Sequence, residues 1–203
     1  MSRRLTLEDI SELRAYERER EEYRRRVIAL KQRRRVAVGP FVTLVFENRD
    51  TIRFQVQEMA RAERMLSDEA IQAELDAYNP LIPEPGQLSA TLFVELTDEA
   101  QLREWLPRLV GIERSVALGL GAGSNGAGPG ELVRDIPEEA HEESLTRENV
   151  TAAVHYIRFE LDPEQVDRFA SAPARLVVDH PEYQYETELS DDTRRELLED
   201  LRD

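Results

Sequence analysis

Cysteine is absent from this chain of 203 residues, which also has one tryptophan and a single lysine, Lys31. Without cysteine, the chain itself cannot form a disulfide, a thiolate nucleophile, a zinc–thiolate site or a cysteine-held iron–sulphur cluster. Long apolar runs are absent too, since no stretch approaches the ~20 residues that a membrane-spanning helix needs. The N-terminus, MSRRLTLEDI, lacks the apolar core of a secretory signal. We therefore expect a cytoplasmic protein with no membrane segment.

Basic residues are fewer than acidic ones, because 27 Lys and Arg face 42 Asp and Glu and the formal net charge is −15. A chain this acidic is unsuited to general nucleic-acid binding. The charge is uneven: residues 1–35 carry 12 basic and 7 acidic residues, net +5, and the other 168 carry net −20. We interpret the runs Arg24-Arg25-Arg26 and Arg33-Arg34-Arg35 as a solvated helix face that pairs with the acidic remainder, in cis or in a dimer.

Helical periodicity begins near the N-terminus. Thr6 and Asp9 have nearly the spacing of a capping box. Apolar residues then recur about every 3.5 positions, at Leu13, Tyr16, Tyr23, Val27 and Leu30. This pattern predicts a long helix that ends near Arg35. Its apolar face is narrow, and we expect it to pack on the rest of the chain or on a second copy in a homo-oligomer.

Two short runs have apolar residues at alternate positions, namely Val42, Leu44 and Phe46, then Ile52, Phe54 and Val56. Folding the chain about Arg49 pairs the two runs and makes one face of a β-hairpin apolar. The turn Asn48-Arg49-Asp50 is compatible with this, because Asn and Asp tolerate left-handed backbone. We therefore predict a hairpin over residues 42–56 and a helix from about Gln57.

The remaining pattern predicts helices alternating with strands. Predicted helices follow Ser67, Asp98, Asp162 and Ser190, each a suitable N-cap. Predicted strands are Leu88–Leu96, Ile112–Leu120, Thr151–Leu161, Ala174–Asp179 and Tyr183–Leu189. At an offset of 64 residues, Asp98, Gln101, Leu102 and Trp105 line up with Asp162, Gln165, Val166 and Phe169. Each set follows a strand and precedes another, which suggests two ferredoxin-like strand–helix–strand units.

The predicted fold class is α+β: a mostly antiparallel sheet with helices on one face, the two ferredoxin-like units and the long N-terminal helix. Residues 1–35 form an N-terminal helical arm. Residues 36–203 form a single α+β domain with a flexible Gly-rich and acidic linker at 121–143. Within it, Gly121–Gly126 matches G-x-G-x-x-G, but the following Gly128-Pro129-Gly130 cannot open the helix that a dinucleotide site requires.

The three histidines differ in their settings. His141 lies in an acidic loop, and His180 precedes Pro181 and is best interpreted as part of a structural turn. His155 shares a strand face with Ile157 and Phe159 and should point inward. It is then either a hydrogen-bonded core histidine or a general base or single metal ligand. The sequence has no other metal-ligand spacing, so His155 is a weak metal candidate only.

Polar side chains gather around the predicted hairpin. The candidate binding residues are Glu47, Arg49, Arg53, Gln55, Gln57, Glu58, Arg61 and His155. Forked donors and amides on one strand face suit a carboxylate or a partner loop. Surface ion pairs explain the same pattern equally well. The pattern assigns no catalytic residue, and we predict no cofactor.

Several strings resemble an uncharacterised bacterial family, the domain-of-unknown-function family 3501. They are ALKQRRRVAVG, FENRDTIRFQVQEMARAER, ELDAYNPLIPEPGQLSATLFVEL, VHYIRFEL and LVVDHPEY. The similarity runs from about Leu5 to Leu201, with the Gly-rich insert 121–130 outside it. Members of that family are often encoded beside a rubrerythrin-like protein and an iron–sulphur oxidoreductase. The resemblance therefore implies an accessory role in electron transfer or peroxide handling, with any cluster held by the partner.

Three functions follow as hypotheses. The first is a non-catalytic accessory protein that docks on redox partners through its acidic surface and N-terminal helix, and it is the one we favour. The second is a small-molecule enzyme or metal-binding protein that uses His155 with Glu47, Arg53 and Glu58. The third is a structural homo-oligomer.

Overall fold

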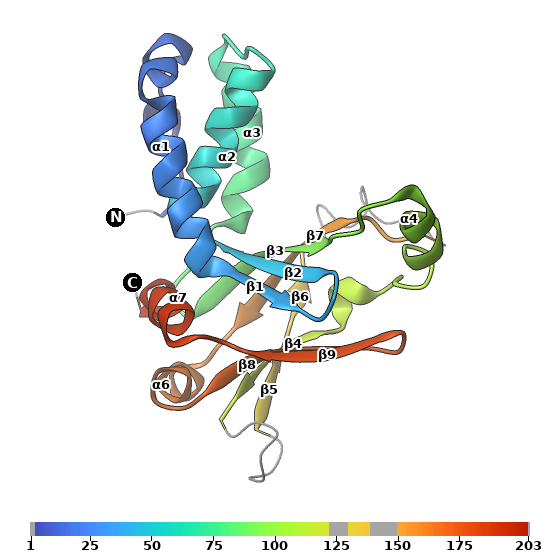
Figure 1. Ribbon diagram of the computed structural model, residues 1–203. Coiled ribbons are helices and arrows are strands. Elements are labelled where there is room, and N and C mark those ends of the chain that lie inside the picture. Colours follow the sequence, from blue (N-terminus) through green and yellow to red (C-terminus); the bar gives the residue numbers. More distant parts are fainter. Residues whose placement is uncertain (1–2, 122–129, 139–149, 203) are drawn as a thin grey trace.

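The computed structural model describes residues 3–121, 130–138 and 150–202, which form two antiparallel sheets with helices around them (Figure 1). Sheet A has the order β1-β2-β3-β7-β6, with β1 Arg35–Val38, β2 Val42–Glu47, β3 Gln87–Val94, β7 Val154–Glu160 and β6 Ile136–Pro137. Sheet B has the order β5-β4-β8-β9, with β5 Glu131–Arg134, β4 Val116–Leu120, β8 Ala174–His180 and β9 Tyr183–Glu188. The predicted α+β class and antiparallel pairing are confirmed.

The helices are α1 Leu13–Arg34, α2 Arg49–Ala62, α3 Asp68–Tyr78, α4 Glu99–Trp105, α6 Pro163–Ser171 and α7 Asp191–Arg202, with short 3₁₀ turns η1 Leu7–Asp9, η2 Asn79–Leu81 and η3 Ile112–Arg114. The long N-terminal helix is confirmed. It begins later than its cap signal indicated, because the Thr6–Asp9 capping box opens η1 instead. The predicted strand at Ile112–Leu120 is correct only from Val116, since η3 occupies its first residues.

The main core lies between the two sheets. Leu44, Phe46 and Phe159 point inward from sheet A, and Leu118 and Leu176 point inward from sheet B. Helices close the two ends of this sandwich. At one end Phe169 of α6 and Leu197 of α7 join the core, and at the other the rings of Phe41 and Trp105 lie 4.8 Å apart. We call this assembly the two-sheet body.

A second, smaller core lies on the outer side of sheet A. Here α1, α2 and α3 stand side by side and project from one end of the sheet (Figure 1). The buried side chains of this core are Leu5, Ile52, Val56, Leu75, Leu81 and Ile82, with Tyr156 of β7 packed against them. We call these three helices, together with residues 3–12, the helical unit.

The predicted hairpin over residues 42–56 is wrong, because its second half is the start of α2. Asn48 caps this helix: its side chain accepts from the Thr51 N–H (3.0 Å), and the Thr51 hydroxyl accepts from the Asn48 N–H (2.9 Å). Ile52 and Val56 are four residues apart, so they share a helix face as readily as a strand face. Both are buried in the smaller core, whereas Phe54 packs edge-on against the ring of Tyr23.

One segment joins the two sheets. β5 pairs with β4 in sheet B, β6 pairs with β7 in sheet A, and only Asp135 separates β5 from β6. Part of the predicted linker 121–143 is therefore ordered strand. The Gly-rich residues 122–129 and the segment 139–149, which contains His141, lie outside the described residues.

The two strand–helix–strand units are present but are not ferredoxin-like. β3–α4–β4 and β7–α6–β8 each begin in sheet A and end in sheet B, so the strands form two sheets and not the single sheet that we expected. The capping is alike in both units. Asp98 accepts from the Gln101 N–H and Asp162 accepts from the Gln165 N–H, both at 2.8 Å.

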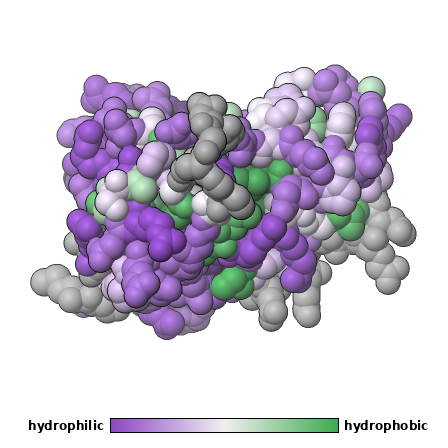
Figure 2. Space-filling view, turned by 90° about the horizontal axis from the view of Figure 1, so that it is seen from below, coloured by the Kyte–Doolittle hydropathy of each residue, from purple (hydrophilic) through white to green (hydrophobic). Residues whose placement is uncertain are grey.

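The second basic run pairs within the chain. Its partners are Glu196 for Arg33, Glu196 and Asp200 for Arg34, and Glu95 for Arg35. Arg34 is 1% exposed and joins α1 to α7. The surface on the side of sheet B is mostly hydrophilic, with apolar residues gathered in its middle (Figure 2). None of the helices in the described part of the chain has the length and apolar character needed to span a lipid bilayer.

Candidate functional site

Three predicted site residues lie four positions apart on α2, and all three hold the N-terminal segment. Arg49 donates through Nη2 to Asp9 Oδ1 (2.6 Å), and Arg53 donates through Nε to the Asp9 carbonyl oxygen (2.7 Å). The Gln57 carboxamide accepts from the Ser11 N–H (2.8 Å) and donates to the Ser11 carbonyl oxygen (3.0 Å). Because this spacing puts them on one helix face, they act together as a clamp on residues 9–11.

Glu58 is the centre of a charge network between α1 and α2. Its carboxylate accepts from the Tyr16 hydroxyl (2.6 Å), from two nitrogens of Arg20 (2.8 Å each) and from Arg61 (3.3 Å). The hydrogen bonds from Arg20 are the largest cause that lowers the pKa of Glu58 to about 2. The carboxylate is therefore kept charged and fixes the two helices to each other.

Glu47 lies at the end of β2, on the side of sheet A that faces the helical unit. It is 5% exposed. Its Oε1 accepts from the Thr91 hydroxyl (2.8 Å), and its Oε2 lies 3.6 Å from Nζ of Lys31, the one lysine of the chain. A buried carboxylate is costly without a partner, so this pair ties α1 to the sheet. Gln55 lies half-buried on α2.

His155 lies on the opposite face of sheet A. It alternates with Tyr156, which packs against the helical unit, so its own side chain turns to the space between the sheets. It is 3% exposed, and its Nε2 lies 2.9 Å from the Thr151 hydroxyl and 2.9 Å from a backbone carbonyl oxygen. The fold therefore does not bring His155 together with Arg53 and Glu58, and its geometry is that of a core histidine.

His180 has the structural role that its turn predicted. Its Nε2 lies 3.0 Å from the Val110 carbonyl oxygen, and its Nδ1 accepts from the Glu182 N–H (3.2 Å). Within the described residues, no group of three or more Asp, Glu or His side chains is arranged to hold a metal ion.

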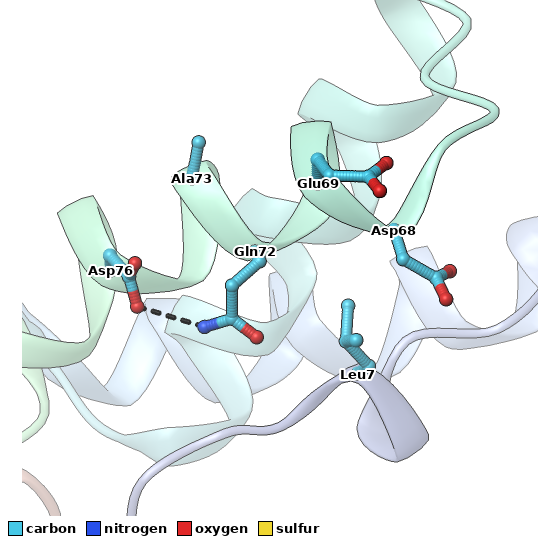
Figure 3. Close-up of a pocket in the computed structure, with 6 residues that line it drawn as sticks. All are labelled: Leu7, Asp68, Glu69, Gln72, Ala73 and Asp76. Carbon is cyan, nitrogen blue, oxygen red and sulfur yellow. Dashed lines mark hydrogen bonds between the residues drawn. The ribbon is translucent and has the colours of Figure 1, made fainter.

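A shallow groove that the sequence pattern did not single out lies between η1 and α3 (Figure 3). It has a volume of about 390 Å³, and its lining residues are Leu7, Asp68, Glu69, Gln72, Ala73 and Asp76. Leu7 faces α3 from η1, and Gln72 donates to Asp76 Oδ1 (2.8 Å). The groove thus combines two small apolar patches, Leu7 and Ala73, with three exposed carboxylates at its rim.

The surroundings of the groove add to its acidity. Helix α3 has no basic residue, and none of the groove carboxylates forms a salt bridge within the part of the chain that the structure describes. Leu66, just before α3, is 87% exposed. The sequence does contain a signal for this polar helix face, because Asp68, Gln72 and Asp76 recur every four residues and therefore lie on one side of the helix.

Comparison with known proteins places the chain in a family. The sequence matches the family model described as "Protein of unknown function (DUF3501)" over residues 4–201. Comparison with curated proteins finds no match. The chain is also similar to a protein of unknown function from Burkholderia pseudomallei with a known crystal structure: identity is 38%, the TM-score is 0.85, and the match covers 97% of this chain and 98% of that one. The chain therefore belongs to the DUF3501 family, as its sequence resemblance predicted.

Proposed function

We propose that the protein is a non-catalytic accessory protein that docks on a protein partner through the groove between η1 and α3. The observation that carries the proposal is the exposed acidic rim of Asp68, Glu69 and Asp76, which makes no salt bridge among the described residues and lies close in sequence to the exposed Leu66. A partner with a basic and partly apolar surface would be steered there by charge and would bury Leu66 on contact.

The family resemblance narrows the choice of partner. It implies a rubrerythrin-like protein and an iron–sulphur oxidoreductase, and the absence of cysteine leaves any cluster to the partner. Redox encounters use small interfaces that form and separate rapidly. A shallow, charged groove suits an interface of that kind better than it suits a permanent complex.

The enzyme hypothesis loses its geometric basis. His155 lies on one face of sheet A, whereas Arg53 and Glu58 lie in the helical unit on the other, where both are engaged. A homo-oligomer formed through the N-terminal helix remains a separate prediction, which light scattering of the full chain would test.

The test uses two variants that change the charge equally. The double variant Glu69→Lys, Asp76→Lys reverses the charge of two groove residues. The double variant Glu164→Lys, Asp167→Lys reverses the charge of two exposed acidic residues on α6. Binding to the purified rubrerythrin-like protein and to the iron–sulphur oxidoreductase of the same organism is measured by calorimetry at low and moderate salt. We expect the wild type to bind one of them with an affinity that falls as salt rises.

The groove variant should bind at least ~10-fold more weakly, and the α6 variant should stay within ~2-fold of the wild type. Equal weakening in both variants would mean that net charge, and not the groove, drives association. Absence of binding to either protein in the wild type would refute the proposed partners.

A further inference from the structure

Two carboxylates are brought together where the chain passes from sheet B to sheet A. Asp135 is the residue between β5 and β6, and Glu113 belongs to η3, which packs against β6 and β7. The N–H of Val116 donates to Asp135 Oδ1 (3.2 Å), and the N–H of Asp135 donates to the Val116 carbonyl oxygen (3.1 Å). These two hydrogen bonds fix the Asp135 carboxyl beside the end of η3.

Each of these carboxylates has one buried oxygen that makes no hydrogen bond, Oε2 of Glu113 and Oδ2 of Asp135. Glu113 is only 4% exposed. Buried polar atoms in folded proteins almost always have a partner, and a buried carboxylate oxygen without one is costly. Two such oxygens, on side chains close enough for the charge of Glu113 to act on Asp135, suit a cation that both could bind.

The electrostatics agree with this geometry. Burial raises the pKa of Asp135 to about 7, and the charge of Glu113 adds to the rise. Arg134, whose charge partly offsets this rise, forms its ion pair with Asp179 (2.6 Å), and Arg158 on β7 lies 3.4 Å from Glu138. In the described residues, neither Glu113 nor Asp135 takes part in a salt bridge.

We propose that Glu113 and Asp135 bind a hard divalent cation, of the class of Mg²⁺, Mn²⁺ and Ca²⁺, through their unpaired oxygens. Carboxylate oxygens are the ligands that these ions prefer, and water and backbone carbonyl oxygens complete their shells. With two side-chain ligands the affinity is modest, in the range of about 10⁻⁴ to 10⁻³ M. The ion would join η3 to the segment that links the two sheets.

The experiment compares the thermal unfolding of the full chain after chelation with unfolding in millimolar MgCl₂, MnCl₂ or CaCl₂, against NaCl at equal ionic strength. We expect at least one of the three ions to raise the Tm of the wild type, because an ion that binds only the folded state stabilises it. Calorimetry should give one ion per chain. Glu113→Gln and Asp135→Asn should each abolish the rise, whereas Glu99→Gln, an exposed acid on α4, should keep it.

Two outcomes would overturn the proposal. One is a wild-type Tm that none of the three ions changes beyond the NaCl control, which would mean that a proton alone neutralises the pair. The other is an equal rise in the Glu113→Gln variant, which would mean that the ions screen the net charge of the whole chain. If both variants fail to fold, as judged by circular dichroism, the electron paramagnetic resonance of Mn²⁺ added to the wild type decides: a bound fraction that Mg²⁺ displaces supports the site, and its absence refutes it.

Discussion

Helix α1 and the two-sheet body are held in place by different forces. In the body, apolar side chains from both sheets fill one core. In the helical unit, only three of the 22 residues of α1 are buried, and one of these is an arginine. Helix α1 is held instead by the Glu58 network and by the Lys31–Glu47 pair. The comparison shows that charged residues clustered in a sequence can hold one helix against the rest of the fold. Such a cluster alone therefore does not indicate a binding or catalytic site.

The largest effect is expected in the core of the body. Phe159→Ala removes a fully buried ring between the sheets. We expect the free energy of unfolding to fall by about 3–5 kcal/mol. Urea unfolding followed by circular dichroism would measure it. A loss confined to the helical unit would contradict the view that this core holds the whole body.

The second effect tests the connection between the two regions. Arg34→Ala leaves Asp200 and Glu196 beside an empty site at the junction of α1 and α7. We expect a loss of about 3 kcal/mol, because removing one partner of a buried pair leaves the other charge uncompensated. The neighbouring Arg33 is half-exposed, and Arg33→Ala should cost less than about 1 kcal/mol. Similar losses of unfolding free energy in both variants would show that the burial of Arg34 does not determine the strength of its ion pairs.

The third effect is a pH dependence in the body. The pKa of Asp135 is about 7 in the folded state and 3.8 as an isolated group. Between these values the folded chain holds a proton that the unfolded chain has lost, so chelated protein should lose stability as pH rises from about 4 to about 7. Asp135→Asn should flatten this part of the Tm profile by several degrees. An unchanged slope would assign the pH dependence to other groups.

The smallest effect tests the helical unit. Tyr16→Phe removes one hydrogen bond to Glu58, and we expect a loss of about 1–2 kcal/mol. Amide exchange should quicken in α1 and α2 while the strands of the body stay protected. The pKa of Glu58 is lowered from 4.5 to about 2, so its contribution is complete above about 4.5 and is lost as pH falls through 2. The two regions should therefore respond to acid in opposite directions.

Much of the fold could be predicted because caps and alternation are local signals. Asp98, Asp162 and Ser67 cap helices as their sequences indicated. The prediction of a hairpin was wrong at Ile52 and Val56, because a spacing of four residues fits one face of a strand and one face of a helix equally well. The Asn48–Thr51 capping box favours the helix, because it caps the N-terminus of α2.

The candidate sites were harder to predict, for two reasons. The acidic face of α3 has the composition of any solvated helix, and its exposure beside Leu7 depends on where η1 lies. Glu113 and Asp135 are 22 positions apart, and only the crossing of the chain between the sheets brings them together. Whether their oxygens find hydrogen-bond partners depends on how the interior packs. The periodicity of apolar residues in the sequence does not predict that.

The strand order of the two-sheet body bears on how this body arose in evolution. The central pairs are β3 with β7 and β4 with β8, both antiparallel, and they are flanked by β2 and β6 in sheet A and by β5 and β9 in sheet B. Each half of the body runs from an outer to a central strand of sheet A, through one helix, and then from a central to an outer strand of sheet B. Strand β1 lies outside this pattern, beyond β2. A twofold axis through the centres of both sheets would relate the halves, and this is the symmetry of a homodimer. The body thus has the layout expected from duplication and fusion of a dimer-forming ancestor, with α2 and α3 lying between β2 and β3 of one half.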